Sequence, residues 1–392
     1  MTAPVPRPPS TGRSERLAAV IRAEISSSSP SSPSSEGRIT FRRYMELALY
    51  HPELGYYRAL ENRPTRGGDF LTAPETNPIF GWTLARWLER QWEELGRPVP
   101  FRLVEYGAGS GTLALTLFDG LRRHERHDLL DALRYSPVET NPYRMIDLTT
   151  RFEAAGLAGH LDVPGAPTEG AGASGGIGSV PVFDVLVANE FLDALPVHRV
   201  AMRDGALREL FVAWRDRFVE IAGEPSTPSL AARLAGEGIA LSDGQSAEIC
   251  LELDAWFGDV STRMRPGGAR ALLLDYGFEA ADLYGPRHRA GTLLGYRGHQ
   301  VVDHPLLDPG DVDLTAHVDF TAVRGAAARV GFVAEPLATQ AEFLLASGLE
   351  AEWQALRSPE TTAGEYAAAR SAILRLLDPR KLGGFRALQL RR

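Results

Sequence analysis

The segment VEYGAGSGT, at residues 104–112, decides the fold because it joins an apolar run to an amphipathic one. Residues 101–106 are typical of a buried strand, and residues 112–123 place their apolar side chains on one side of a helix. Three glycines, at alternate positions from Gly107 to Gly111, fall where the strand would end and the helix begin. Glycines there let the backbone turn tightly, and the first N–H groups of a helix are free to bind a ligand. The segment therefore predicts a turn that binds a nucleoside cofactor.

The spacing of the glycines distinguishes between two cofactors. A dinucleotide fingerprint needs a third glycine at the position of Thr112. The pattern here is instead G-x-G-x-G, and Glu105 lies two residues before the first glycine. S-adenosylmethionine carries an ammonium and a sulfonium but no pyrophosphate, so a nearby carboxylate suits it. We expect S-adenosylmethionine to bind at Glu105, Gly107, Gly109 and Gly111; a plain glycine-rich turn and an NAD site are the alternatives.

Beyond this turn, strand-like runs alternate with helical patterns. FDVLVA (183–188) and ALLLD (271–275) are continuously apolar, as expected for strands that are buried on both faces. The alternation predicts an α/β fold with a mostly parallel sheet and helices on both faces. Residues 385–390 form one more strand-like run, whose direction the sequence leaves open.

Two insertions are predicted within the domain that spans residues 101–392. Residues 197–245 contain strand patterns around an Asp204-Gly205 turn, which indicates an antiparallel hairpin. Residues 280–318 form a second, irregular stretch.

The first hundred residues are predicted to form two regions. Residues 37–100 are expected to be a helical and lid region, with helices at 41–50 and 79–95. Residues 1–36 are rich in Ser and Pro, and we expect a mostly disordered, solvated arm with a short helix at 13–25. The apolar face of that helix would carry Leu17, Val20, Ile21 and Ile25.

Polar residues follow the predicted strands. Glu139 ends the second strand and is expected to hold ribose hydroxyls, unless it is a surface acid or a helix cap. Asn189, Glu190 and Asp193 follow FDVLVA, and the carboxyl ends of parallel strands face the ligand crevice. We therefore expect Glu190 and Asp193 to hold a cationic or hydrogen-bonding group of the substrate, with the alternative that Asp193 caps or packs a short turn. The next strand ends in Asp275, Tyr276 and Gly277, which would face the same crevice.

Composition excludes several other classes. The net charge of −8 argues against a nucleic-acid binder. Cys250 is the single cysteine, so neither an intrachain disulfide nor a cysteine-based zinc site is expected, and no His/Asp/Glu spacing suggests a metal. No apolar run is long enough to span a membrane and no signal peptide is recognisable, so we expect a cytoplasmic protein. His299 and His317 lie in the second insertion and are either catalytic bases or, more commonly for lone histidines, structural.

Taken together, the motifs resemble the MidA-like methyltransferases, formerly the domain of unknown function DUF185, whose mitochondrial members act in complex I assembly. The resemblance covers about residues 37–391. Its motifs are ITFRRYMELALYHPELGYY (39–57), GDFLTAPETNPIFG (68–81), VEYGAGSGTLA (104–114), VETNP (138–142), ANEFLDALPVHRV (188–200), LLLDYG (272–277), GTLLGYRGHQVVDHPLLDPGDVDLTAHVDF (291–320) and TQAEFLLASG (339–348). The chain has Tyr106 and Ala108 where the family commonly has Leu and Pro, and Asn141 where Ser is more frequent.

The resemblance implies a Rossmann-like class I methyltransferase that acts on a protein arginine. Residues Glu105 to Gly111, Ala108 among them, and Glu139 would bind S-adenosyl-L-methionine. A loop with Asp69, Thr72 and Pro74 would lie over the cofactor, and Asn189, Glu190 and Asp193 would line the acceptor site. A homodimer is compatible with the sequence. The alternatives are a small-molecule O- or N-methyltransferase and an assembly factor that binds the cofactor without turnover.

Overall fold

The computed structural model describes residues 12–28, 37–58, 72–163, 181–298 and 300–392. Two of the residues predicted to act in the site, Asp69 and His299, lie outside the described residues.

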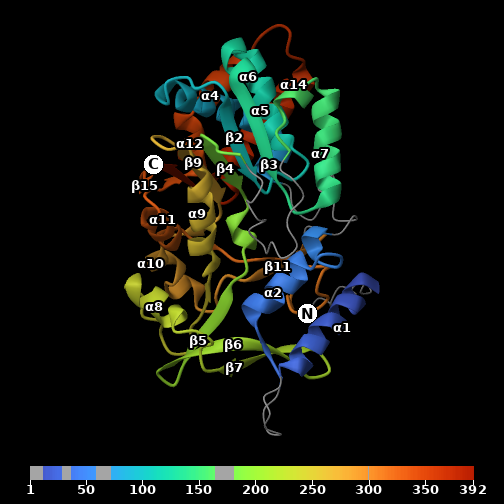
Figure 1. Cartoon of the computed structure of the whole chain (residues 1–392), viewed down its shortest axis with the longest axis vertical. Coiled ribbons are helices and arrows are strands. Elements are labelled where there is room, and N and C mark those ends of the chain that lie inside the picture. The colour runs from blue at the N-terminus through green and yellow to red at the C-terminus, as the bar shows by residue number, and fades with distance from the viewer. Residues whose placement is uncertain (1–11, 29–36, 59–71, 164–180, 299) are drawn as a thin grey trace.

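A seven-stranded sheet forms the upper part of the molecule in Figure 1. Four strands are parallel in the order β3 (Leu133–Val138), β2 (Phe101–Tyr106), β4 (Val185–Asn189) and β9 (Arg270–Asp275). β17 (Arg386–Arg391) lies antiparallel to β9, and β15 (Val333–Ala334) and β16 (Ala338–Thr339) pair with its outer edge. The predicted α/β fold is confirmed, and the closing strand is antiparallel.

Helices cover both faces of this sheet, as predicted. Alternate residues of β2 enter different cores: Leu103 packs in one layer and Val104 in the other. The Leu103 layer contains α4 (Ile79–Glu94), α5 (Thr112–Arg123), α6 (His127–Ala132), α7 (Pro142–Ala154), α12 (Gln340–Ala346), α13 (Leu349–Ala355) and α14 (Ala363–Leu377). The Val104 layer contains α9 (Glu252–Arg263) and α11 (Phe320–Arg329).

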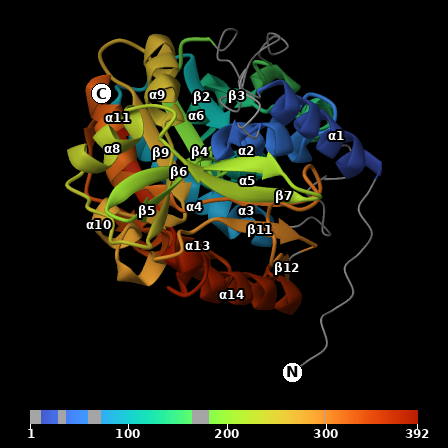
Figure 2. The same ribbon diagram turned by 90° about the horizontal axis from the view of Figure 1, so that it is seen from below.

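An antiparallel sheet forms the lower part of the molecule, and Figure 2 shows its strands from below. The strands are β1 (Ile39–Thr40), β5 (His198–Arg203), β6 (Ala206–Trp214), β7 (Phe218–Gly223) and β8 (Ser246–Ile249). Asp204 and Gly205, both at positive φ, join β5 to β6 as the predicted hairpin turn. β1 comes from the N-terminal region and pairs with the end of β6, a contact that the sequence did not predict.

Short elements connect the two sheets. β11 (Leu294–Arg297) pairs with β12 (Gln300–Val301) and β13 (Asp313–Thr315), and β10 (Gly277–Phe278) pairs with β14 (Val318–Asp319). The remaining helices are α1 (Gly12–Ser27), α2 (Phe41–Tyr50), α3 (Ala73–Thr76), α8 (Ser229–Gly236) and α10 (Ala280–Leu283).

The first helix corrects the prediction of a solvated arm. In α1, Leu17 and Ile21 are fully buried in a core that they share with α2. Arg13 donates to the carbonyl oxygen of Gly310 and forms an ion pair with Asp311 at 2.8 Å. Val20, predicted on the buried face, is exposed instead.

Candidate functional site

The glycine turn lies at the carboxyl end of β2, in the middle of the parallel strands. Gly107, Gly109 and Gly111 all have positive φ, at 69°, 55° and 75°, a region that L side chains rarely adopt. A Cβ at Gly111 would lie 2.8 Å from the Leu148 side chain, and one at Gly107 would lie 3.3 Å from the Phe191 ring. This path therefore favours glycine, and Gly111 is also the N-cap of α5, where no side chain caps the helix. The glycines shape the turn into a cradle at the N-terminus of α5, which fits a cofactor bound there.

Glu139 connects this turn to the end of the neighbouring strand β3. Its carboxylate accepts from the Gly109 N–H at 2.9 Å and from the Asn141 N–H at 2.8 Å, and Arg144 lies 3.9 Å away. Asn141, not Glu139, caps α7. A carboxylate oxygen has more than one lone pair, so Glu139 can still accept from ribose hydroxyls. Its role in holding the ribose stays a prediction.

Glu105 is more deeply buried than the sequence indicated. Only 5% of its surface is exposed, and the Tyr135 hydroxyl donates to its Oε2 at 2.7 Å. Burial raises the pKa of Glu105 to about 8, although the Tyr135 hydrogen bond opposes the shift. A nearby positive charge would stabilise the ionised form, so this carboxyl group is suited to respond to a cationic ligand.

The three predicted acceptor residues do come together at the end of β4. Glu190 has a positive φ of 50°, which is a strained conformation for a residue other than glycine. Its Oε1 accepts from the Ala73 N–H at 3.1 Å and from the Asn189 side-chain amide at 3.2 Å. Burial, reinforced by the charge of Asp193, raises the pKa of Glu190 to about 8, although the hydrogen bond from the Ala73 N–H opposes the shift. A nearby cation would favour the ionised form of this carboxyl group.

Asp193 lies in the short 3-10 helix Leu192–Ala194 that follows β4. One carboxylate oxygen accepts from the Tyr276 hydroxyl, and burial raises the pKa of Asp193 to about 6. Among the described residues, the other oxygen, Oδ1, is buried and has no hydrogen-bond partner. The same is true of Oδ1 of Asn189. Buried acceptors without donors are costly, so two of them only four positions apart in the sequence indicate a site for a donor-rich group.

Asp275 holds the backbone of this loop. Its Oδ2 accepts from the N–H groups of Phe191, Leu192 and Asp193 at 3.1, 2.8 and 3.3 Å. Its Oδ1 accepts from the Tyr276 N–H at 2.8 Å. The sequence placed Asp275 and Tyr276 at the crevice but gave them no role.

Two tyrosines from the N-terminal region also reach the site, and sequence reasoning missed both. The hydroxyl of Tyr50 donates to the Ala194 carbonyl oxygen at 2.9 Å. The hydroxyl of Tyr57 donates to Asp313 at 2.7 Å, and the Tyr57 carbonyl oxygen accepts from the Asn141 side chain at 2.8 Å. The motif at 39–57 was a signal for this region, but nothing in it indicated these contacts.

The remaining predicted residues lie around this cluster. Thr72 is the N-cap of α3, and Pro74 is buried within this helix. The two residues flank Ala73, whose N–H donates to Glu190. The ring of His317 makes an edge contact with Tyr276, with 5.3 Å between ring centroids. Burial lowers the pKa of His317 to about 4, so this histidine is neutral at physiological pH.

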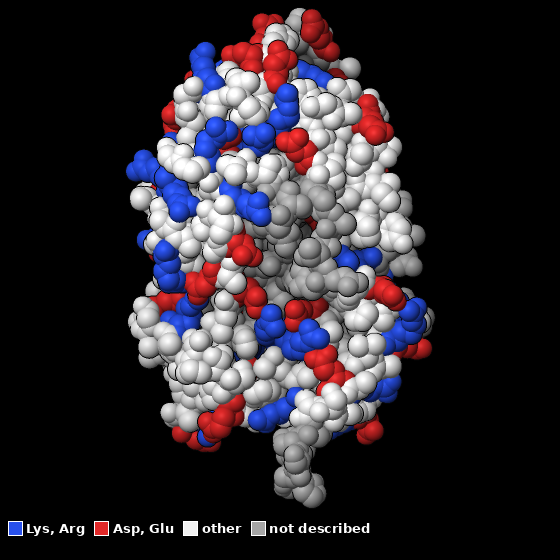
Figure 3. All heavy atoms as spheres, in the orientation of Figure 1, with Lys and Arg blue, Asp and Glu red and all other residues white. Residues whose placement is uncertain are grey.

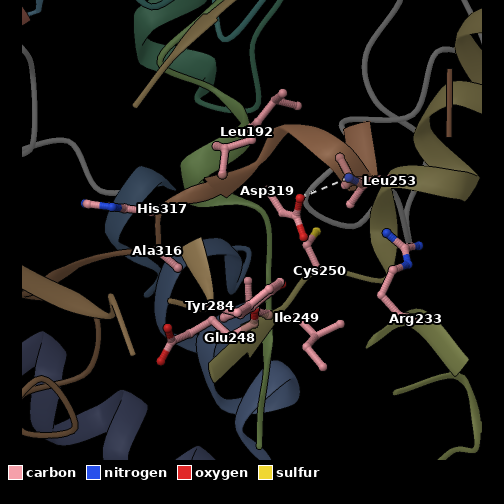
Figure 4. A pocket seen from close by; sticks show the side chains of 13 residues that line it. Leu192, Arg233, Glu248, Ile249, Cys250, Leu253, Tyr284, Ala316, His317 and Asp319 are labelled. Atoms are coloured by element: carbon pink, nitrogen blue, oxygen red, sulfur yellow. Dashed lines mark hydrogen bonds between the residues drawn. The ribbon is translucent and has the colours of Figure 1, made fainter. Parts of the chain in front are cut away.

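Figure 4 shows a small cavity that is lined in part by Leu192, from the segment that follows β4. Leu192, Cys250 and Asp319 come from different segments and meet around it, with His317 at one side. Its volume is about 20 Å³, enough for one water molecule but far too small for a nucleoside cofactor. This cavity is therefore not the cofactor site.

Other kinds of site find little support in the described part of the chain. No group of three His, Cys, Asp or Glu residues there could hold a metal ion. None of the helices in that part is long and apolar enough to cross a membrane. Figure 3 shows acidic and basic side chains interspersed on the face in view, without one extended basic surface.

Comparisons with known proteins agree with the geometry of the glycine turn. A family model described as "Putative S-adenosyl-L-methionine-dependent methyltransferase" matches residues 83–336. The mitochondrial protein arginine methyltransferase NDUFAF7 homolog of Drosophila melanogaster is 32% identical over 353 residues, which cover 83% of this chain and 74% of that protein. Human mitochondrial NDUFAF7 is 28% identical over 89% of this chain and 79% of that protein.

A solved structure is similar over the full length. It is a COG1565 superfamily member from Burkholderia thailandensis, bound to S-adenosyl-homocysteine. The sequence identity is 31% and the TM-score is 0.83, with 100% of this chain and 95% of that chain covered. The chain thus belongs to this family of S-adenosyl-L-methionine-dependent methyltransferases, and S-adenosyl-L-methionine is its cofactor.

Proposed function

We propose that the protein transfers a methyl group to a guanidinium nitrogen of an arginine in a protein substrate. The observation that carries this proposal is a pair of buried oxygens that have no donor among the described residues, Oδ1 of Asn189 and Oδ1 of Asp193. The Asn189 side chain also contacts the carboxyl group of Glu190. A guanidinium has five N–H donors and no acceptor, so it can donate to several such oxygens at once. The relatives named protein arginine methyltransferases support the same choice.

The charge of the site also favours a cationic acceptor. Glu190, Asp193 and Asp275 lie within one cluster, and burial, together with the charges of Asp193 and Glu190, raises the pKa of Asp275 well above its usual range. A cation among them would relieve this mutual repulsion and would lower all three pKa values. A neutral acceptor would leave the raised pKa values in place.

We infer that the cofactor binds at the turn formed by Glu105, Gly107, Ala108, Gly109 and Gly111, with Glu139 toward the ribose. S-adenosyl-L-methionine supplies an electrophilic methyl carbon on its sulfonium. The protein's part is to align the acceptor nitrogen, since alignment can contribute much of the rate increase. Asp193, with a pKa of about 6, is mostly ionised at neutral pH and is the residue best suited to accept the proton that the guanidinium releases.

The test is methyl transfer from labelled S-adenosyl-L-methionine to an arginine-containing peptide library, with wild-type protein and the variants Glu190→Gln and Asp193→Asn. We expect turnover with wild type and a loss of at least about a hundredfold in each variant. Glu279→Gln is the matched control, because Glu279 is an exposed acid that pairs only with Arg324 among the described residues. Cofactor binding without turnover on any arginine peptide would favour the assembly factor, and turnover only on small molecules would favour the metabolite enzyme.

A further inference from the structure

We propose that the end of β9 is a positioning device for the acceptor site, in which Asp275 fixes the backbone of the loop after β4 and Tyr276 fixes the carboxylate of Asp193. This inference rests on the proposed role of Asp193 in binding a guanidinium. Asp275 and Tyr276 would act through Asp193 and are therefore positioning residues.

The first part of the device is a carboxylate that gathers N–H groups. Three consecutive N–H groups, of Phe191, Leu192 and Asp193, point to the same oxygen of Asp275. Residues 191–193 form at most one turn of helix, too short to hold its own shape through internal hydrogen bonds. The Asp275 carboxylate, at the end of the neighbouring strand, accepts the hydrogen bonds that the turn cannot form internally. Asp275 is only 1% exposed, so water does not compete for these hydrogen bonds.

The second part of the device is a side-chain contact to the acceptor carboxylate. The Tyr276 hydroxyl donates to one oxygen of Asp193 and so leaves Oδ1 as the oxygen that can receive the substrate. The Tyr276 ring is itself enclosed, since it packs against His317 and Phe385, each with 5.3 Å between ring centroids. The direction in which Oδ1 points is thus fixed by a tyrosine that has little freedom to move.

Tyr276 also controls the charge of Asp193. Burial raises the pKa of this carboxyl group, and the Tyr276 hydrogen bond, which favours the ionised form, lowers it more than the backbone N–H group of either Ala194 or Asp193 does. The other titratable side chains whose charges interact with Asp193 come from several segments of the chain: Tyr50, Tyr57, Glu190, Asp275 and Tyr296. None of them offsets the burial as the Tyr276 hydroxyl does, so removal of that hydroxyl should raise the pKa of Asp193.

The decisive experiment measures this pKa directly and does not need the substrate. Protein labelled with ¹³C at the aspartate carboxyl carbons is titrated by NMR, and the Asp193 signal is assigned with Asp193→Asn. In Tyr276→Phe we expect the pKa of Asp193 to rise by about one to two units, the size of a hydrogen bond to a charged group. Tyr284→Phe is the matched control: Tyr284 is also 9% exposed, but its hydroxyl donates to the carbonyl oxygen of Glu248 at 3.2 Å. A shift in Tyr276→Phe no larger than in Tyr284→Phe would overturn the role of Tyr276.

The variant Asp275→Asn tests whether the Asp275 carboxylate fixes the backbone of the loop after β4. The amide would have to place an NH₂ group either against the three loop N–H groups or against the Tyr276 N–H, so the loop must move. We expect the Asp193 signal to shift and its pKa to change, while S-adenosylhomocysteine, titrated calorimetrically, still binds and so reports a folded protein. A folded Asp275→Asn with the wild-type pKa of Asp193 would overturn the role of Asp275, and if this variant does not fold, Tyr276→Phe decides the proposal.

Kinetics separate this inference from the proposed function. With an arginine peptide as acceptor, Tyr276→Phe should raise the acceptor KM about tenfold and move the acidic limb of the pH profile to higher pH, because Asp193 then ionises later. An unchanged acidic limb would contradict the inference. If no arginine peptide is methylated, the proposed function fails, yet the NMR titration still decides whether Tyr276 controls Asp193.

Discussion

The side-chain amide of Asn141 donates a hydrogen bond of 2.8 Å to the backbone carbonyl oxygen of Tyr57, 84 residues earlier in the chain. Asn141 follows β3 at the cofactor edge of the sheet, and its Oδ1 also caps α7 by accepting from the Tyr143 and Arg144 N–H groups. One side chain therefore connects the cofactor edge to the N-terminal region that contacts the acceptor site.

Substitutions of Asn141 should separate these two roles. Asn141→Ala removes both the cap and the link, and we expect the free energy of unfolding to fall by about 2 kcal/mol. Asn141→Ser keeps a capping oxygen but has no amide to reach Tyr57, so a loss of about 1 kcal/mol is expected. Urea denaturation of the two variants checks this; equal losses would mean that only one of the two roles contributes.

Gly111 should not tolerate a side chain. Gly111→Ala combines the strain of positive φ with a Cβ 2.8 Å from Leu148, and we expect the dissociation constant of S-adenosylhomocysteine to rise at least about tenfold. Gly156→Ala is the matched control, with φ of 69° and nothing within 4 Å of its Cβ. It should lose about 1 kcal/mol of stability from backbone strain and keep its affinity. Calorimetric titration that found equal affinities in both variants would contradict a cofactor cradle at Gly111.

His124 should make stability depend on pH. It lies between two carboxylates, with Nδ1 2.5 Å from Glu89 and Nε2 2.8 Å from Glu352, and these hydrogen bonds overcome burial and raise its pKa to about 8. The folded pKa lies above the unfolded value of about 6.5, so the stabilisation is fully present below about pH 6.5 and is lost as pH rises through about 8. We expect a contribution of about 1 to 2 kcal/mol.

The difference between wild type and His124→Gln isolates this contribution from other groups that titrate. Chemical denaturation at several pH values should show that the gap between the two proteins narrows between about pH 6.5 and about pH 8.5. A difference in stability that stays constant would mean that folding does not raise the pKa of His124.

Glu105 should couple cofactor binding to pH. Its pKa of about 8 means that the buried carboxyl group is mostly protonated at about pH 6 and mostly ionised at about pH 9. If the Glu105 carboxylate interacts with the ammonium group of the ligand, the affinity of the wild-type protein for S-adenosylhomocysteine should increase from about pH 6 to about pH 8.5. The variant Glu105→Gln should lose most of that increase. Calorimetric titration at both pH values makes the comparison, and the same increase in the variant would exclude this role for Glu105.

Local patterns predicted the central sheet well. The sequence placed residues 101–106 in a strand and residues 112–123 in a helix, and the structure has β2 and α5 with those bounds. Both depend on periodicity and on glycines that need positive φ, which are properties of neighbouring residues. The acids after β3 and β4 were predictable for the same reason, because parallel strands bring their carboxyl ends together.

Contacts between segments that are distant in the sequence could not be predicted from such local patterns. Asp275 gathers the N–H groups of residues 191–193, more than 80 positions away in the chain, and nothing near either segment indicates the pairing. The burial of α1 was missed for a similar reason: its partners, α2 and the segment around Asp311, become visible only when the chain is folded. The direction of β17 likewise depends on the path of the chain between strands.

The pairing of β1 with β6 has a consequence for how this protein could be shortened. Ile39 and Thr40 lie beside Phe211 and Val212 in one sheet, so the N-terminal region and the first insertion are not separate modules. Deleting the insertion would free the strand that leads directly into α2, and with it the tyrosines that reach the acceptor site. A shortened protein should therefore keep both the N-terminal region and the first insertion, or lose both.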